Sequence, residues 1–346
     1  MAVRTYDEYI ASLKAMRPNI YKFDELIEDV TEHPATKRTV EGHAWTYKAA
    51  NDPDLRDKFV TTSHLDGEPI SRYLSIIREP QDMYDNSDMK RAMFQLTGTC
   101  TGGRCAGWTA LNAMFITAWD MDKDLGTDYH QRLLKWLADA QKRDITISGA
   151  LTDPKGDRTK QPHQQDDPDM FLRVVEKRDD GIVVRGAKVM ICGVAAANEI
   201  FILPGSAYRE EDKDYAVSFV IPRDIENLTI VETRHPSDGR DTDEGFDNPV
   251  TEGGITQAYL FFEDVFVPNE RVFMVGETKY TKTAVMSFIM PYRSAIGGCV
   301  AGQGDVKIGS AILTARTNGL SAKVFRDKIT QMHINNETTY AMGIAA

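Results

Sequence analysis

Three of the four cysteines lie in glycine-rich segments, where their thiolates could bind a metal. Cys100 and Cys105 are separated by four residues, and Cys299 lies far along the chain, directly after two glycines. Thiolates are ligands for soft metals and for iron–sulfur clusters. However, the spacing of the first pair is not that of a standard zinc site, and three thiolates do not complete a four-ligand set. Buried, inert cysteines would give the same pattern, so both interpretations stay open on spacing alone.

The segment 151–158 (LTDPKGDR) is a second candidate site, because it follows a run with strand-like alternation. Its proline and glycine favour a tight turn in which several backbone N–H groups converge. Lys155 and Arg158 add positive charge beside them. Such a turn suits a phosphate or an electron-rich cofactor ring. An ordinary solvated turn is the alternative interpretation.

Composition and charge exclude several classes of protein. The chain has 346 residues and a net charge of −11, so it has no overall attraction for nucleic acid or for an anionic membrane. We find no stretch of about 18 uncharged apolar residues and no N-terminal signal sequence. The seven histidines form no pair at metal-ligand spacing, and there is no phosphate-binding loop or dinucleotide fingerprint. We therefore expect a cytoplasmic protein whose cysteines are free or metal-bound.

The elements that position these residues divide the chain into three expected domains. Residues 1–143 are predicted to form a helical domain, with a capping box from Thr5 to Glu8 and helices over 69–98, 106–122 and 128–143. Residues 144–275 are predicted to form a β-barrel or β-sandwich domain that carries the 151–158 loop. The sequence Asp179-Asp180-Gly181 there is a strong hairpin signal.

Residues 276–346 are expected to begin a C-terminal helical bundle. Two helices bury their apolar faces poorly without further partners, and the sequence stops without a helix-ending signal. We therefore expect that this bundle is truncated or that a partner subunit covers it. The predicted fold class is α+β and multidomain.

Four segments closely resemble one family of flavoproteins: 151–158, 167–188, 261–273 (FFEDVFVPNERVF) and 297–309 (GGCVAGQGDVKIG). The family contains 4-hydroxyphenylacetate 3-monooxygenases and 4-hydroxybutyryl-CoA dehydratases, which are also vinylacetyl-CoA Δ-isomerases. The resemblance covers essentially the whole chain, and the cysteine arrangement favours the dehydratase branch. It implies an FAD protein with the acyl-CoA dehydrogenase-like fold, usually a homotetramer.

The resemblance also implies two segments that contact FAD. They comprise Leu151, Thr152, Asp153, Pro154, Lys155, Gly156, Asp157 and Arg158 in the first, and Met190, Ile191 and Cys192 in the second. The dehydratases carry threonine where this chain has Cys192. A thiol is a weaker hydrogen-bond donor than a hydroxyl, so this departure would change the surroundings of the flavin.

In the dehydratases, three cysteines and one histidine hold a [4Fe-4S] cluster. The resemblance places the three thiolates at Cys100, Cys105 and Cys299, with the first pair one residue further apart than usual. The histidine position is occupied by Tyr292, whose phenol is a poor base at neutral pH. Three further departures belong to the same site: Ile296 replaces a tyrosine, Val300 a lysine and Gln257 a glutamate.

These changes together remove the acid–base groups that dehydration of 4-hydroxybutyryl-CoA requires. The leading hypothesis is a flavin-dependent lyase, isomerase or oxidoreductase that acts on an acyl-CoA thioester, with Tyr292 and Gln257 as polar substrate contacts. The first alternative is an FADH₂-dependent aromatic 3-monooxygenase of the 4-hydroxyphenylacetate type, served by a separate flavin reductase, because Tyr292, Ile296 and Val300 suit a phenolic ring. An inactive paralogue or a fragment is the second alternative.

Overall fold

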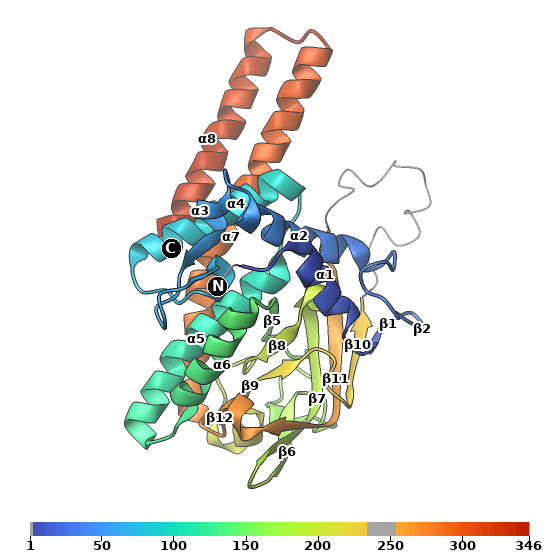
Figure 1. Cartoon of the computed structure of the whole chain (residues 1–346), viewed down its shortest axis with the longest axis vertical. Coiled ribbons are helices and arrows are strands. Elements are labelled where there is room, and N and C mark those ends of the chain that lie inside the picture. Colours follow the sequence, from blue (N-terminus) through green and yellow to red (C-terminus); the bar gives the residue numbers. More distant parts are fainter. Residues whose placement is uncertain (1–2, 234–253, 346) are drawn as a thin grey trace.

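Helices come first and last in the chain, and most strands lie between them (Figure 1). The computed structural model describes residues 3–233 and 254–345. The helices are α1 (Tyr6–Lys14), α2 (Lys37–Asn51), α3 (Arg56–Phe59), α4 (Pro80–Thr97), α5 (Gly102–Leu125), α6 (Tyr129–Arg143), α7 (Thr278–Thr317) and α8 (Lys323–Ala345). The strands are β1 (Ile20–Lys22), β2 (Glu25–Leu26), β3 (Val60–Thr62), β4 (Pro69–Ser71), β5 (Ile147–Ala150), β6 (Arg173–Lys177), β7 (Gly181–Cys192), β8 (Glu199–Ile202), β9 (Val217–Pro222), β10 (Leu228–Glu232), β11 (Gln257–Pro268) and β12 (Val272–Val275).

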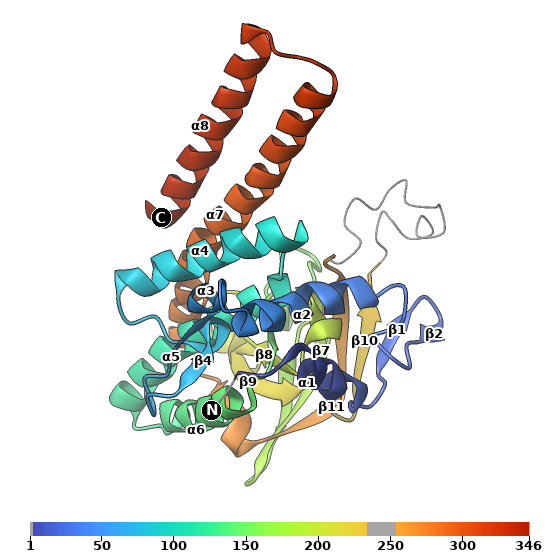
Figure 2. The same cartoon turned by 45° about the horizontal axis from the view of Figure 1, so that its top comes forward.

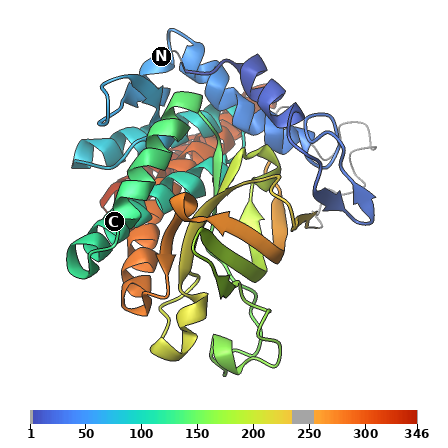
Figure 3. The ribbon, with the colours of Figure 1, turned by 60° about the horizontal axis from the view of Figure 1, so that its bottom comes forward.

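The two larger sheets pack against each other as a sandwich. One has the strand order β2-β1-β10-β11-β7-β6, and the other has the order β12-β9-β8-β5. Neighbouring strands are antiparallel, except that β1 is parallel to β10 and β5 is parallel to β8. Figure 3 shows the strands gathered on one side of the molecule and the helices along the other.

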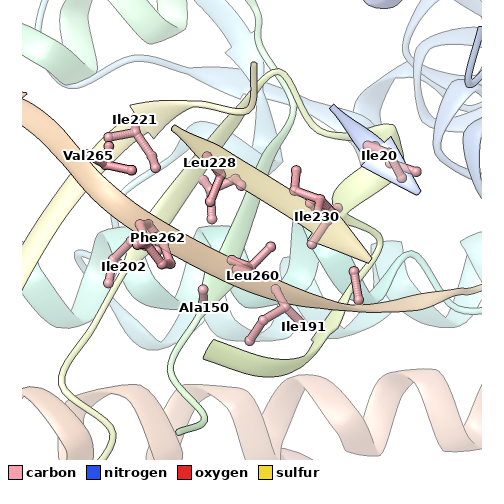
Figure 4. Close-up of a cluster of buried hydrophobic side chains, with 14 of the residues drawn as sticks. Ile20, Ala150, Ile191, Ile202, Ile221, Leu228, Ile230, Leu260, Phe262 and Val265 are labelled. Atoms are coloured by element: carbon pink, nitrogen blue, oxygen red, sulfur yellow. The ribbon is translucent and has the colours of Figure 1, made fainter. Parts of the chain in front are cut away.

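Aliphatic and aromatic side chains fill the space between the sheets (Figure 4). Ile191, Leu260 and Phe262 come from the six-stranded sheet, and Ile202 and Ile221 come from the four-stranded sheet. None of these five is more than 2% exposed. Burial of one such side chain contributes roughly 1.5–3 kcal/mol, so the sandwich is a firm support for the loops at its ends.

Helix α5 lies directly on strand β5, and glycines allow this close approach. A Cβ atom at Gly107 of α5 would be 2.2 Å from the carbonyl oxygen of Ile147. A Cβ atom at Gly149 of β5 would be 2.4 Å from the carbonyl oxygen of Ala106. Because both contacts involve backbone atoms, this junction fixes the height of α5 above the sheet.

Helices α7 and α8 form a hairpin that extends away from the rest of the molecule (Figures 1 and 2). Gly297 of α7 faces Gly343 of α8, and Gly298 of α7 faces Ser87 of α4. Among the described helices, α7 is the one whose length and apolar composition would suffice to cross a membrane. Part of that apolar surface is buried here against α4, α5 and α8.

Several local predictions are confirmed, and one helix is shorter than predicted. The capping box from Thr5 to Glu8 begins α1, and the predicted hairpin joins β6 to β7. The helix predicted over 69–98 begins only at Pro80, because Pro69–Ser71 pairs with β3 as strand β4. The chain before residue 144 also contributes β1 and β2 to the large sheet.

Candidate functional site

The 151–158 loop follows β5, and a buried lysine of β7 binds the first residues of the loop. Lys188, which is 2% exposed, donates to the carbonyl oxygens of Leu151 (3.0 Å) and Leu203 (2.9 Å). Its Nζ lies 2.6 Å from the carboxylate of Asp153, which also accepts a hydrogen bond from the Tyr208 hydroxyl at 2.7 Å. The start of the loop is therefore tied to strand β7 by a buried ion pair.

The far half of the loop is exposed and carries the two basic side chains. Gln165 spans the turn, since its amide oxygen accepts from the Asp157 N–H at 3.0 Å and its amide nitrogen donates to the Asp157 carbonyl at 2.9 Å. Lys155, Gly156 and Arg158 are exposed. In the described part of the chain, neither basic side chain has an ion-pair partner, so both remain available to an anionic ligand.

The second expected flavin segment lies beside the first. The Val189 N–H donates to the Thr152 carbonyl at 2.9 Å, which joins the loop to the end of β7. Met190 has a left-handed backbone with φ of 57° and is 45% exposed, whereas Ile191 is buried. Cys192 is half-buried, and burial raises the pKa of its thiol. The two segments that the sequence separates by more than thirty residues thus form one continuous surface.

The three cysteines of the candidate metal site come together where α4, α5 and α7 meet. The three thiols line one cavity, and Cys105 is 4% exposed. Interaction with the neighbouring Cys100 thiol, and then with that of Cys299, holds the pKa of the Cys105 thiol well below its usual range. The same contact raises the pKa of Cys100. The sequence prediction that these three residues converge agrees with this arrangement.

The thiol group and the flavin segments meet at Cys192. A Cβ atom at Gly102, the first residue of α5, would be 3.3 Å from Cβ of Cys192 and 3.7 Å from Sγ of Cys100. Gln257 is the register partner of Cys192 across β11 and β7, and its amide donates to the Cys192 thiol at 3.5 Å. Because Gly102 has no side chain, Cys100 of the thiol group and Cys192 of the second flavin segment can lie close to each other.

Tyr292 projects into the same region from α7. It is half-buried and stacks on Phe288 with 5.3 Å between the ring centroids. Burial is the main cause that raises the pKa of its phenol, and the nearby cysteines add to the effect. The hydroxyl therefore stays protonated at neutral pH and can donate a hydrogen bond, but it cannot act as a base.

A cavity of about 300 Å³ lies between these side chains. Its polar lining comes mainly from the three thiols of the candidate metal site and from Tyr292. The remaining lining residues are Phe94, Gly102, Ala295, Ile296, Val300 and Gln303. No carboxylate or histidine lines it, so within the described residues the cavity offers sulfur ligands and apolar walls but no side-chain base.

In an iron–sulfur cluster each protein thiolate binds a different iron, so the thiolates stand further apart than the ligands of a single metal ion. Within residues 3–233 and 254–345, no three His, Cys, Asp or Glu side chains are arranged to hold one metal ion. The thiols of Cys100, Cys105 and Cys299 nevertheless face one cavity, and thiolates are the ligands such clusters use. The donor set therefore fits a cluster that the three thiolates would hold, and Tyr292 lines the same cavity.

His43 of α2 packs against Gly103, next to the candidate site, and was not singled out from the sequence. Its Nδ1 donates to the Thr39 carbonyl at 2.7 Å. The other ring nitrogen, Nε2, is then a hydrogen-bond acceptor that has no partner among the described residues. A Cβ atom at Gly103 would lie 3.0 Å from both His43 Nε2 and the Cys192 carbonyl oxygen. Burial lowers the pKa of His43 to about 4.

Buried lysines are the other residues that the sequence reasoning missed. Lys188 has apolar neighbours on both sides in the second half of β7, and Lys90 shares the helical stripe of Met83, Ser87 and Phe94. A cation at such a position signals a buried partner or a ligand, and this signal was present in the sequence.

The chain is similar in sequence to two groups of enzymes. Residues 5–274 match the family model described as 4-hydroxyphenylacetate 3-hydroxylase N terminal. The 4-hydroxybutyryl-CoA dehydratase/vinylacetyl-CoA-Δ-isomerase of Clostridium aminobutyricum is 40% identical over 99% of this chain and 70% of its own length. The 4-hydroxyphenylacetate 3-monooxygenase oxygenase component of Thermus thermophilus is 28% identical over 81% of this chain and 56% of its own length.

Solved structures of both groups share the fold. An oxygen-tolerant archaeal 4-hydroxybutyryl-CoA dehydratase from N. maritimus superposes with a TM-score of 0.95 at 34% identity, over 99% of this chain and 68% of that one. An oxygenase component of 4-hydroxyphenylacetate 3-monooxygenase, complexed with FAD, gives a TM-score of 0.83 at 24% identity, over 98% of this chain and 70% of that one. The second likeness concerns the fold alone. The expected acyl-CoA dehydrogenase-like fold is confirmed.

Proposed function

Because the chain belongs to the 4-hydroxyphenylacetate 3-hydroxylase family, we propose that it is an FAD-dependent enzyme that acts on an acyl-CoA thioester. One observation carries this proposal: the two expected flavin segments and the three thiols form one site that meets at Cys192. The 40% identity to a dehydratase that uses a CoA ester favours the thioester as substrate. The flavin would accept or return hydrogen at the substrate.

Residues 151–158 and 190–192 are the proposed flavin contacts. Lys155 and Arg158 are cations on an exposed turn without ion-pair partners among residues 3–233 and 254–345, which suits the negative charge of a dinucleotide. Cys192 and Gln257 would face the flavin from the end of β7 and the start of β11. Gln257 can donate and accept hydrogen bonds but cannot take up a proton, so it would orient the ligand.

Tyr292 is the proposed substrate contact. A phenol that stays protonated can donate a hydrogen bond to the thioester carbonyl and stabilise charge that develops on that oxygen. The absence of a base from the described cavity lining argues against removal of an unactivated proton by this chain.

A [4Fe-4S] cluster at Cys100, Cys105 and Cys299 is part of the proposal. When bound, such a cluster supplies electron transfer or a Lewis-acidic iron. This chain would contribute the three thiolates, a narrow apolar cavity and the Tyr292 hydroxyl beside it. We further propose a homo-oligomer, with a tetramer as the expected state, and a cytoplasmic location.

The test is anaerobic purification, followed by an absorption spectrum, flavin, iron and sulfide assays and incubation with CoA thioesters. We expect one FAD and about four irons per chain, together with binding of a CoA thioester that perturbs the flavin spectrum. The Lys155→Ala/Arg158→Ala double variant tests the proposed flavin loop. It removes both exposed cations and should weaken FAD binding at least tenfold. Protein that binds FAD but no CoA thioester would exclude the thioester proposal.

A second function is favoured by the apolar cavity wall of Phe94, Ile296 and Val300. These side chains would pack well against an aromatic ring, and the Thermus thermophilus relative is an aromatic monooxygenase component. This function predicts hydroxylation of a phenol that depends on O₂ and on FADH₂ supplied by a separate reductase. Flavin without iron, together with phenol oxidation, would favour it over the first. Absence of flavin binding would instead indicate an inactive paralogue or a fragment.

A further inference from the structure

Lys90 of α4 is a buried cation that the proposed function does not use. Its side chain is 1% exposed, and its Nζ has no hydrogen-bond partner within the described residues. The ammonium lies 4.6 Å from the centre of the Trp108 ring. A ring face recovers only part of the cost of removing an ammonium from water. Lys90 therefore requires a negative charge nearby.

No described carboxylate supplies that charge. The three acidic residues on the same helix are engaged elsewhere: Asp82 accepts from the backbone N–H groups at the helix start, Asp85 pairs with Arg72 at 3.0 Å, and Asp88 pairs with Lys58. Asn86 and Ser87, one turn before Lys90, are also buried and have side-chain polar atoms without partners in residues 3–233 and 254–345. The region around Lys90 is thus polar and positively charged, with no carboxylate among the described residues to balance it.

The Trp108 ring faces Lys90 from α5, and two of the thiols belong to the same buried region. Trp108 lies one helical turn after Cys105 on α5, and Gly298, which touches the backbone of Ser87, precedes Cys299 on α7. Met89, Met93, Cys105 and Trp108 belong to one buried cluster, and Cys299 packs against it. The positive charge of Lys90 acts on both Cys105 and Cys299.

We propose that Lys90 is a positioning charge that balances an anionic iron–sulfur cluster held by Cys100, Cys105 and Cys299. This inference rests on the cluster part of the proposed function. Three thiolates outweigh the double positive charge of an oxidised [4Fe-4S] core, and reduction adds another negative charge. A fixed buried cation therefore stabilises the reduced cluster more than the oxidised one and raises the reduction potential.

The experiment measures the cluster and not turnover. Wild type, Lys90→Met, Lys90→Arg and the control Lys323→Met, which changes an exposed lysine on α8, are purified anaerobically and reconstituted with iron and sulfide. The midpoint potential of each is then measured by a redox titration followed by electron paramagnetic resonance. We expect Lys90→Met to disfavour the reduced cluster at least tenfold, which is about 59 mV for one electron. Lys90→Arg and Lys323→Met should stay close to wild type.

Equal midpoint potentials in wild type and a loaded Lys90→Met protein would overturn the proposal. If Lys90→Met does not fold, Lys90→Gln keeps a polar side chain at the site and gives the same comparison. Wild type that takes up no iron would also overturn it, because no anionic cluster would then face Lys90. FAD binding and thioester binding are measured on the same samples, so failure of this inference is distinguishable from failure of the proposed flavin enzyme.

Discussion

Gln257 and Tyr292 are polar side chains of the candidate site that do not act as bases near neutral pH. Gln257 occupies the register position opposite Cys192 and donates to its thiol, as a donor and acceptor of fixed charge. Tyr292 lines the cavity with a hydroxyl whose pKa is raised mainly by burial. Both side chains would orient a ligand in the proposed function, and neither accepts a proton near neutral pH. At this scale the described cavity lining offers hydrogen-bond donors and thiols but no carboxylate or imidazole.

His43 should make the protein sensitive to acid. Burial lowers its pKa to about 4, against an ordinary value near 6.5, with Arg104 and Cys105 as the neighbouring charged groups. Between these pH values the unfolded chain binds a proton that the folded chain does not, so the stabilising contribution is full above pH 6.5 and is lost as pH falls towards 4. The loss amounts to at most about 3 kcal/mol.

The measurement is the free energy of unfolding by denaturant at several pH values. His43→Gln can still donate to the Thr39 carbonyl but does not titrate, so its stability should fall less steeply between pH 6.5 and 4. His333→Gln, on the exposed surface of α8, is the matched control and should follow wild type. Parallel curves for wild type and His43→Gln would contradict the prediction.

Two kinds of contact hold together the elements that meet at the site: a close backbone approach and a buried ion pair. Gly107 lets α5 approach the carbonyl oxygen of Ile147 in β5 closely. Lys188 ties β7 to the start of the 151–158 loop, the proposed flavin loop, through Asp153 and the Leu151 carbonyl. Each contact can be broken by one substitution without touching the proposed ligands.

Gly107→Ala should destabilise the fold by forcing α5 away from β5. The added carbon would lie 2.2 Å from a backbone oxygen, and overpacking of this kind costs about 1–3 kcal/mol. Gly309→Ala on α7 is the control, because no atom lies within 4 Å of its Cβ position, and it should add roughly 0.5–1 kcal/mol. Chemical denaturation measures both. A Gly107→Ala protein as stable as wild type would contradict the described contact.

Lys188→Met should weaken FAD binding by loosening the start of the flavin loop. The Asp153 carboxylate would keep the Tyr208 hydroxyl but lose its cation, and removal of one partner of a buried pair costs about 3–5 kcal/mol. We expect the dissociation constant of FAD to rise at least tenfold. Titration of flavin-free protein with FAD measures it.

Lys177→Met, on the exposed part of β6, is the matched control for this effect and should bind FAD as wild type does. The double variant Lys188→Met/Asp153→Asn should recover part of the stability, because no buried charge is left alone, while FAD binding stays weak. Wild-type affinity in a folded Lys188→Met protein would show that the loop is held by other contacts.

The sequence predicted these elements unevenly, for physical reasons. The hairpin at Asp179-Asp180-Gly181 and the capping box at Thr5 depend on neighbouring residues, so local patterns sufficed. Strand β4 forms where the helical periodicity predicted a helix, because pairing with β3 outweighs that pattern. A lysine in an apolar helical stripe marked the position of Lys90, but the sequence did not reveal that it packs on Trp108 of another helix. The grouping of the cysteines came from family resemblance and not from their spacing. The boundaries at 143/144 and 275/276 stay predictions.

At the scale of the whole molecule, the α7–α8 hairpin stands apart from the sandwich and carries exposed apolar side chains. Leu313 of α7 and Val324, Ile334 and Met342 of α8 are all more than half exposed. Patches of this kind mark surfaces that other protein segments cover. The hairpin is tied to the body mainly through α4, where Gly302 of α7 lies against the backbone of Arg91.

Arg91→Ala should release this hairpin without unfolding the sandwich. The Arg91 guanidinium binds both carboxylate oxygens of Asp305, at 2.7 and 2.9 Å, and also pairs with Glu337 of α8. Loss of such charged hydrogen bonds costs about 1.5–3 kcal/mol, so amide exchange in α8 should become at least tenfold faster. Hydrogen-exchange mass spectrometry measures α8 and the β-strands separately.

Lys323→Ala is the control for Arg91→Ala, because it removes an exposed ion pair with Asp327 at the opposite end of α8. It should leave exchange in the middle of the helix unchanged. Faster exchange in β7 and β11 of the Arg91→Ala protein would mean that the hairpin and the sandwich unfold as one unit.

The gathering of all four cysteines around Tyr292 gives this chain a natural chemical reporter. The sequence contains no other cysteine, so every atom of a sulfhydryl-directed label on the native protein must sit at this one centre. The number of sulfhydryls that react before and after denaturation then counts how many are shielded there. A mercury compound would likewise bind within this one region in a crystal.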